Sequence, residues 1–555
     1  MTAKKYIYLA ISLLILNGCG CDKEYIDKNI TISQTPTVET LGKYQHIHAA
    51  INIGNTPKTL YLIMTNDSNI QTHNSVQKNF KLSKQNPSKQ YNKSLPQTNG
   101  IIRTPDYVKE FEKQVAEILH KKSQNNLKSL NKITIQQNQS SVGDSKLFYI
   151  DDTSSGATTT ATLKKQVAVS TSFGNKTLEV WVSDDAFAGS GCTKSNCVDQ
   201  TMVDNLADKF LKSGSDNDIY DWDTNIYGQE WGADAQTKES KLIGADNHIT
   251  ILLTDINNDN RADEGVIGYF YAKDNFKASE ISGSNQRIMF YIDSVMYANP
   301  DHSRHDWQKE TYSTLAHEFQ HMIHFYQKSI LLANGNMTDT WINEMISETT
   351  EDLVSTKIDN VGPRGIDPSD GSAGAAGNKK GRYTYFNILP YISLTQWNNS
   401  LYNYSHVSSF GAFLVRNYGG AKLLHDIMHN PLLHEDAVMD AIHKTAQGEG
   451  KTFGDILREW AIAVALSDIE RPVMQAKTDL PSYNSGDFTY DTYGNSTYKL
   501  GSINFFNYDP SLKFSNCNTV YANSNCYYKI GNNLTGNITI DIDLDKNTTA
   551  TLIAK

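Results

Sequence analysis

The sequence from Leu315 to Phe325 reads LAHEFQHMIHF, and the rest of the chain is best interpreted outward from it. His317 and His321 are four residues apart, so on an α-helix their imidazoles share one face and can bind a single metal ion. Glu318 would lie beside that metal, where a base can take a proton from a metal-bound water. This H-E-x-x-H arrangement is typical of zinc-assisted hydrolysis of a peptide bond. The alternative is a buried helix with two hydrogen-bonded core histidines.

The surrounding residues favour a helix at this position. Asp306 is a suitable N-cap, and neither proline nor glycine interrupts the residues from Trp307 to Leu332. Apolar side chains recur there at intervals of three and four positions, which predicts a stripe packed against the core. The members of this stripe are Leu315, Phe319, Met322, Ile323 and Tyr326.

The segment Trp341–Glu348 contains a candidate third ligand. A catalytic zinc takes three protein ligands and keeps a fourth position for water. Glu344 would complete a His-His-Glu set, and Glu348, one turn further on, would accept a hydrogen bond from a ligating histidine and fix its tautomer. The alternative is an acidic helix face exposed to solvent, since Glu351 and Asp352 follow closely. The segment resembles the N-E-x-x-S-[DE] motif of the gluzincin peptidases, the thermolysin-like clan.

Further blocks of sequence resemble one family in more detail, the hyicolysin-type neutral metallopeptidases of family M30. The resemblance covers about residues 142–467, and only its metal-binding segment is highly specific. It implies a zinc endopeptidase that is secreted or held at the cell surface and acts on proteins or peptides. The blocks are Val198–Asp204, Tyr220–Trp222, Gly265–Phe270 and His317–His321.

The order of predicted elements suits an α+β fold with two lobes, as the gluzincin resemblance implies. Mostly strand-like sequence, with a helix at about 200–211, precedes the H-E-x-x-H, and largely helical sequence follows it. In that clan an edge strand pairs with the extended substrate, and Arg287–Asp293 is the candidate here. The predicted strands are 147–150, 178–182, 249–253 and 288–292, and the predicted later helices are 408–417, 435–444 and 453–466.

The same resemblance implies a donor that stabilises the oxyanion of the tetrahedral intermediate. Gluzincins commonly use a tyrosine or histidine of the helical lobe for this purpose. Tyr404 and His406, just before the predicted helix at 408–417, are the candidates. Ordinary aromatic residues of a loop are an equally good interpretation.

An acidic stretch after the predicted strand 249–253 resembles the first half of a calcium-binding loop. Asp255, Asn257 and Asp259 place oxygen-bearing side chains at alternate positions, as a Ca²⁺ site requires. The pattern is incomplete, because Asn260 stands where glycine is usual and Val266 where glutamate is usual. A solvated turn is the alternative, since Asn and Asp dominate turns.

The N-terminus predicts export. Lys4 and Lys5 precede an apolar run too short to span a membrane comfortably, and Leu16–Cys19 resembles a bacterial lipobox. We therefore expect a lipoprotein signal peptide over residues 1–18, lipidation of Cys19, and anchoring of the protein to the cell envelope by lipid. An ordinary secretory signal is the alternative.

Cysteine spacing and net charge agree with an exported protein. The pairs Cys192/Cys197 and Cys517/Cys526 would close short loops, and disulfides are expected in an oxidising compartment. The net charge of −10, with no dominant basic stretch, argues against binding to nucleic acid.

The 555 residues are enough for two or three domains. After the signal peptide, residues 19–141 contain a tether, a linker rich in Asn, Lys, Ser and Gln, and a helix that begins near Thr104–Pro105. This region is a propeptide, a spacer or a small accessory domain. We expect the metallopeptidase domain at 142–475 and a small β-sandwich at 482–555.

Two functions of other classes also fit the sequence. One is an adhesin-like surface lipoprotein with a structural or vestigial metal site. The other is a metal-dependent amidase of the cell wall. The H-E-x-x-H with a downstream glutamate favours peptide bonds as the substrate.

Overall fold

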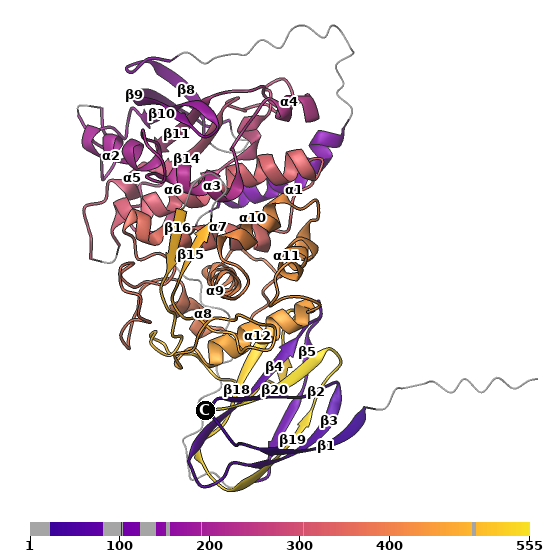
Figure 1. The fold of residues 1–555 in the computed structure, drawn as a ribbon. Helices are drawn as coiled ribbons and strands as arrows, with labels where there is room; N and C mark the ends of the chain where they lie inside the picture. Colours follow the sequence, from indigo (N-terminus) through magenta and orange to yellow (C-terminus); the bar gives the residue numbers. More distant parts are fainter. Residues whose placement is uncertain are drawn as a thin grey trace, which may run out of the picture.

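Three regions follow one another along the molecule (Figure 1). A six-stranded sheet lies at one end, helices fill the middle, and a β-sandwich lies at the other end. The structure, a computed structural model, describes residues 23–80, 101–102, 104–121, 140–150, 156–189, 191–303, 305–490 and 496–555. The predicted signal peptide and Cys19 lie outside these residues. In the described parts of the chain, no helix is both long and apolar enough to cross a membrane.

The six-stranded sheet has the order β13-β14-β11-β10-β9-β8. Its central strands are apolar on both faces, as expected for strands covered on two sides. Alternate residues of β10 separate accordingly: Val180 packs toward the main helical core, whereas Trp181 joins a smaller aromatic cluster on the opposite face. The strands are β8 Ser145–Tyr149, β9 Thr158–Thr171, β10 Gly174–Ser183, β11 His248–Thr254, β13 Gly268–Phe270 and β14 Ile288–Asp293.

The edge strand expected at Arg287–Asp293 is an interior strand. This segment forms β14, which pairs in parallel with β11 on one side and antiparallel with β13 on the other. Both of its hydrogen-bonding sides are therefore occupied, and the expectation was wrong. β13 forms the edge of the sheet, directly after the short strand β12 (Gly265–Val266).

The helices form the core against which this sheet packs. α6 begins where expected, with the Asp306 side chain accepting a hydrogen bond from Lys309 N–H at 3.3 Å, but it continues after His324 as a π-helical stretch, Phe325–Leu332. The α-helices are α1 Asp106–His120, α2 Gln200–Phe210, α3 Ile219–Tyr227, α4 Asp234–Lys238, α5 Ser294–Tyr297, α6 Trp307–His324, α7 Thr340–Ile358, α8 Tyr383–Ile388, α9 Leu401–Asn417, α10 Ala421–His429, α11 His434–His443 and α12 Phe453–Ala465.

The β-sandwich is built from both ends of the chain, whereas the sequence placed it in residues 482–555 alone. One sheet has the order β1-β3-β19-β6 and the other β18-β4-β20-β2, so each sheet combines N-terminal and C-terminal strands (Figure 1). The N-terminal strands are β1 Glu24–Thr31, β2 Thr37–Lys43, β3 Gln45–Asn52, β4 Lys58–Asn66 and β6 Ser75–Lys78. The C-terminal strands are β18 Ser524–Leu534, β19 Asn537–Asp543 and β20 Thr548–Ala554. Shorter pairs are β5 Thr72–His73 with β17 Thr519–Val520, and β15 Gly486–Tyr490 with β16 Ser496–Leu500.

Strand β4 explains why the N-terminal strands pack with the C-terminal strands. Its residues are buried on both faces: Leu60, Leu62 and Met64 pack inside the sandwich, whereas Tyr61 and Ile63 pack into the main core beside α12. Side chains of a strand alternate between its two faces, so a strand apolar on both requires cover on both. The C-terminal strands supply one cover and the helical region the other.

Both predicted disulfides, Cys192–Cys197 and Cys517–Cys526, are present. The first closes a short loop before α2, and the second ties the start of β18 to the segment before it. Their presence agrees with folding in an oxidising compartment.

Candidate metal centre

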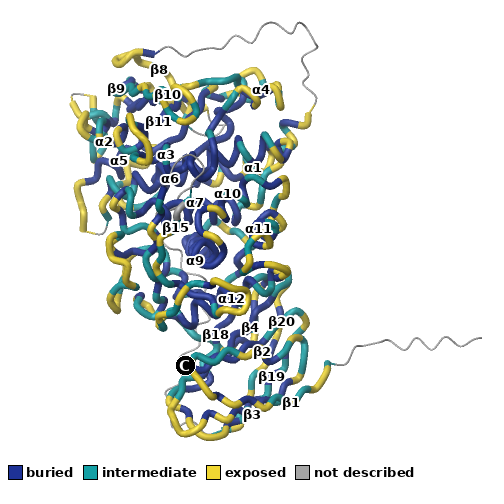
Figure 2. The backbone as a smooth tube through the Cα atoms, in the orientation of Figure 1, coloured by how far each residue is buried: buried dark blue, intermediate teal, exposed yellow. Residues whose placement is uncertain are grey.

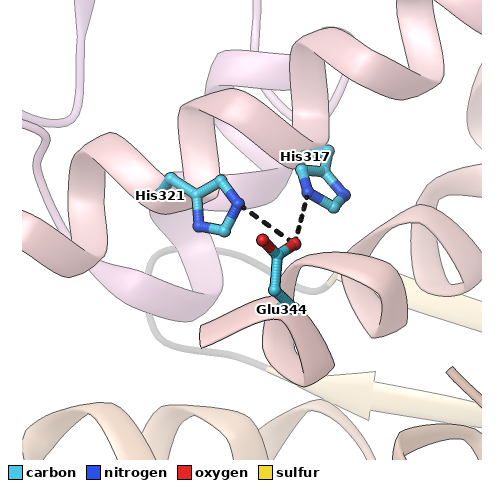
Figure 3. A group of neighbouring side chains, drawn as sticks. All are labelled: His317, His321 and Glu344. Atoms are coloured by element: carbon cyan, nitrogen blue, oxygen red, sulfur yellow. Dashed lines mark ion pairs between the residues drawn. The ribbon is translucent and has the colours of Figure 1, made fainter. Parts of the chain in front are cut away.

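Helices α6 and α7 bring the three predicted ligands together (Figure 3). Glu344 Oε2 lies 3.3 Å from His317 Nε2 and 3.6 Å from His321 Nε2. A tetrahedral zinc with bonds of about 2.0–2.1 Å separates its ligand atoms by about 3.3 Å. The observed spacing of these atoms therefore fits zinc.

The same three atoms also lack other partners. His317 Nε2, His321 Nε2 and Glu344 Oε2 are buried, and none has a hydrogen-bond partner among the described residues. A buried polar atom without a partner is unfavourable by about 1–3 kcal/mol, so three such atoms directed at one point indicate a ligand that satisfies them together. A divalent cation does so.

Glu351, and not Glu348, supports His317. One oxygen of Glu351 lies 2.8 Å from His317 Nδ1, and the other accepts a hydrogen bond from Ser313 Oγ at 2.7 Å. Glu348 instead forms a bidentate ion pair with Arg382, at 2.9 and 3.1 Å. The carboxylate that supports the histidine is therefore Glu351, one helical turn after the predicted Glu348. The prediction failed because the crossing of α6 and α7, and not spacing along α7, decides which carboxylate meets the histidine.

His321 is oriented by neutral partners. Its Nδ1 lies 3.0 Å from Asn343 Oδ1 and 3.1 Å from Ser347 Oγ. Ser347 donates its own hydroxyl proton to Gln320 Oε1, so it is an acceptor toward the histidine. Acceptors at Nδ1 favour the tautomer that leaves the Nε2 lone pair free for a metal.

Glu318 lies next to these ligands but does not join them. Its Oε2 accepts a hydrogen bond of 2.8 Å from Phe270 N–H, in the edge strand β13. Its Oε1 is buried without a hydrogen-bond partner among the described residues. Burial raises the pKa of Glu318, as does the charge of Glu344, while His317 and His321 lower it. One oxygen is thus fixed by the sheet, and the other is available to hold a proton.

The charges at the centre favour a cation. Burial would raise the pKa of Glu344, but Lys109, His317 and His321 more than offset this and hold it well below its ordinary value. Burial would lower the pKa of His317, but the carboxylates of Glu344 and Glu351 raise it to about 10. Glu344 therefore stays ionised and stabilises positive charge beside it.

Of the two oxyanion candidates, the structure brings only Tyr404 to the centre. Its hydroxyl lies 3.4 Å from Glu344 Oε1, and burial raises its pKa well above the ordinary value, so it remains a proton donor. His406 is directed elsewhere: its Nδ1 bonds to Tyr402 O at 2.9 Å, and its ring packs against Phe386. Both residues lie inside α9. In an α-helix, residues i and i+2 point about 200° apart around the axis, so Tyr404 and His406 cannot share a face.

The acidic turn at Asp255–Asp259 gives no support for calcium. Lys194, from the loop closed by Cys192–Cys197, places its ammonium 2.8 Å from Asp255 Oδ2 and 2.7 Å from Asn258 Oδ1. Both oxygens of Asp255 also accept from Asn260 N–H, and Asp259 Oδ1 accepts from Arg261 N–H. The carboxylates of Asp255 and Asp259, two of the three groups expected to bind a cation, therefore have partners within the protein.

Two important residues of the centre were missed in the sequence. Glu351 lies seven positions after Glu344, on the same helix face, but Glu348 lies on that face too, so spacing alone does not identify Glu351. It is 2% exposed, so the acidic face of α7 is not solvated here. Lys109 of α1 bonds to Glu344 Oε1 at 2.7 Å, and no local pattern predicts a contact between residues so distant in the chain.

The chain is similar both to a known family and to an individual relative. The profile of the peptidase M30 family matches residues 155–517. The neutral metalloprotease ShpI of Staphylococcus hyicus is 24% identical over 309 residues, which make up 54% of this chain. The matched part spans 59% of the length of that relative.

Proposed function

The chain belongs to the peptidase M30 family, and from that premise we propose that it is a zinc-dependent endopeptidase. The observation that carries the proposal is the convergence of His317 Nε2, His321 Nε2 and Glu344 Oε2, all buried and without hydrogen-bond partners among the described residues. The carboxylate of Glu318 lies beside them, in a position suitable for a general base. The metalloprotease title of the relative from Staphylococcus hyicus points the same way.

In this proposal His317, His321 and Glu344 would hold the zinc, which would acidify a water molecule and polarise the scissile carbonyl. Glu318 accepts the proton of the attacking water and delivers it to the leaving amine. The hydrogen bond from Phe270 N–H fixes the carboxylate of Glu318 for both transfers. Tyr404, kept protonated, donates toward the oxyanion of the tetrahedral intermediate.

The arrangement of lobes belongs to the same proposal. The sheet region contributes Glu318's partner Phe270, and the helical region contributes Tyr404 through α9. A cleft between these regions, over the metal centre, would be the two-lobed architecture of the gluzincins. The edge strand β13 would then be where an extended substrate adds a strand to the sheet.

We propose further that the protein works outside the cytoplasm, attached to the cell envelope through lipid on Cys19. The two disulfides support an oxidising location. Metabolic labelling with a radioactive fatty acid tests the anchor: label should enter the wild-type protein and be absent from Cys19→Ala. Equal labelling of both would reject Cys19 as the anchor.

The central experiment uses protein that begins after Cys21, as wild type and as Glu318→Gln. Bound metal is quantified, and casein, a peptide library and peptidoglycan fragments are offered before and after limited proteolysis. We expect about one zinc per chain in both proteins, with peptide cleavage in wild type only. Zinc without any cleavage would favour the adhesin-like surface protein, and release of peptidoglycan fragments alone would favour the amidase. Absence of bound metal would reject the proposal.

A further inference from the structure

The metal centre is closed to a polypeptide in this conformation. His317 and Glu318 are 0% exposed, Glu344 2% and His321 6%. The helices that carry these residues, α6 and α7, run through the buried interior (Figure 2). An endopeptidase must admit an extended chain to such a centre, so some part of the molecule has to move or leave.

The side chain that closes the centre comes from α1. The ammonium of Lys109 lies 2.7 Å from Glu344 Oε1 and 4.7 Å from the centre of the Trp397 ring. Thr104, just before α1, also directs its hydroxyl at Glu344 Oε1, at 3.4 Å. The two histidines face the other carboxylate oxygen, Oε2. Lys109 therefore anchors α1 to the ligand Glu344 without competing for the atom that would bind a metal.

The body of α1 covers the aromatic surface beside the edge of the sheet. The Tyr107 ring packs against Tyr269 and Tyr271, with ring centres 5.9 and 5.8 Å apart. The Phe111 ring packs edge-on against Tyr271 and Phe276, at 5.4 and 5.9 Å. Tyr269 lies in β13, whose next residue holds Glu318, so this surface adjoins the proposed general base.

The backbone before α1 occupies a strand position at the same place. Strand β7 (Ile101–Ile102) pairs in parallel with β12, which leads directly into β13. A substrate that binds by adding a strand needs a strand edge that is not already paired. Strand β7 therefore occupies the edge of β12, next to β13 in the chain, while α1 covers the aromatic surface and Lys109 contacts the ligand Glu344.

Both ends of α1 are fastened by polar contacts with the catalytic region. Asn399 Nδ2 donates to Thr104 O at 3.1 Å and to Asp106 Oδ1 at 2.9 Å. At the other end Lys241 Nζ donates to Leu119 O at 2.8 Å, where a cation stabilises the negative end of the helix dipole. These contacts are hydrogen bonds, so displacing α1 from the catalytic region need break only noncovalent interactions.

We infer that strand β7 and the segment Thr104–His120 are a built-in inhibitor that occupies the substrate site, with Lys109 anchored at Glu344. The inference rests on the proposed function, because it assumes that the site takes a polypeptide. It also assigns the surface of Tyr269, Tyr271 and Phe276 to substrate binding. A peptide that replaces the inhibitor would place aromatic or large apolar side chains on this surface.

The test compares two variants of the protein that begins after Cys21. Tyr107→Ala/Lys109→Ala/Phe111→Ala removes the contacts of α1 with the centre. The control, Glu110→Ala/Lys113→Ala/Glu117→Ala, changes an equal number of side chains on the solvent face of α1, where these groups are 63–68% exposed. Peptide cleavage is measured together with the binding of a fluorescent peptide hydroxamate, a zinc-directed probe. Zinc content and Tm check that each variant is folded.

We expect the first variant to cleave at least tenfold faster and to bind the probe at least tenfold more tightly than wild type, with the control like wild type. A synthetic peptide of residues 101–121 should inhibit the first variant, and the same peptide with Lys109→Ala should inhibit less. Equal rates in all three proteins would overturn the inference. Loss of zinc or of cleavage in the first variant would overturn it too, because α1 would then be a permanent part of the active enzyme.

The readouts separate this inference from the proposed function. If no protein cleaves any peptide but the first variant alone admits the probe, α1 does cover the centre and the peptidase proposal fails. If wild type cleaves as fast as the first variant, the peptidase proposal holds and the inhibitor does not.

Discussion

Two segments of this chain carry sequence patterns of metal ligands, and the fold treats them differently. At α6 and α7, His317, His321 and Glu344 leave three buried atoms without hydrogen-bond partners among the described residues. At the acidic turn, Asp255 binds the ammonium of Lys194 and the backbone of Asn260. In the first segment the chain's own ammonium, Lys109, binds Glu344 Oε1, and the three atoms that face one another are left for a ligand. In the second segment the chain's own ammonium binds the oxygens that a metal would need.

The difference shows what a ligand pattern needs in order to become a site. Donor atoms at suitable spacing are common, because Asp and Asn also favour turns. They bind a metal only where the surrounding fold offers no better partner. The loop closed by Cys192–Cys197 delivers Lys194 to the acidic turn. At Glu344, Lys109 binds Oε1, and within the described part of the chain Oε2 has no hydrogen-bond partner.

Removal of a ligand should have the largest effect. His317→Ala is expected to abolish both zinc binding and peptide cleavage, because two ligands hold zinc too weakly for a stable site. Asp255→Ala, the matched change in the other segment, should leave zinc content and cleavage as in wild type. Metal analysis and a fluorogenic peptide assay measure both. Zinc lost from Asp255→Ala would erase the contrast between the two segments.

Glu318→Gln should separate binding from chemistry within the first segment. We expect full zinc content and a decrease in kcat of about 10²–10⁴-fold, the usual contribution of a general base. The amide keeps the size of the side chain and cannot accept the proton. Wild-type kcat in this variant would assign the base to another residue.

Tyr404→Phe should lower kcat by about 10²–10³-fold with little change in KM, as expected when one donor to an oxyanion is removed. His406→Leu is the control, because His406 packs on the far side of α9. It should change Tm more than kcat. A KM effect alone in Tyr404→Phe would mean that the tyrosine binds substrate without stabilising the oxyanion.

Glu351→Gln should weaken zinc binding by about 10–100-fold, the usual effect of losing a carboxylate that orients a ligating histidine. Glu348→Gln breaks the ion pair with Arg382 and should instead lower stability, by about 3–5 kcal/mol for a buried pair that loses one partner. Competition with a chelator and thermal unfolding distinguish the two effects. Equal zinc affinities in the two variants would show that Glu351 does not orient His317.

The smallest expected effect concerns calcium. Millimolar Ca²⁺ should leave Tm unchanged, because the oxygens of Asp255 are already bound to Lys194 and Asn260. A ligand that binds only the folded state would raise Tm. A rise of several degrees that Asp255→Ala abolishes would show that the turn binds calcium after all.

Much of the centre could be predicted from local spacing. His317, Glu318 and His321 share one helix, and Glu344 lies on a helix with a recognisable motif. The choice between Glu348 and Glu351 could not be predicted, because both fit the periodicity of α7. The choice between Tyr404 and His406 depended on which face of α9 is turned toward the metal centre. Their spacing showed only that the two side chains lie on different faces of the helix.

The sequence by itself determined the elements, the ligand types and the disulfide pairs, since these depend on residues close along the chain. Tertiary structure alone decided that β4 joins the two ends of the chain in one sandwich, that Lys194 satisfies Asp255, and that Lys109 meets Glu344. Such contacts join residues far apart in sequence. They follow from how whole elements pack, and packing is set by the shape of the complete core rather than by any local period.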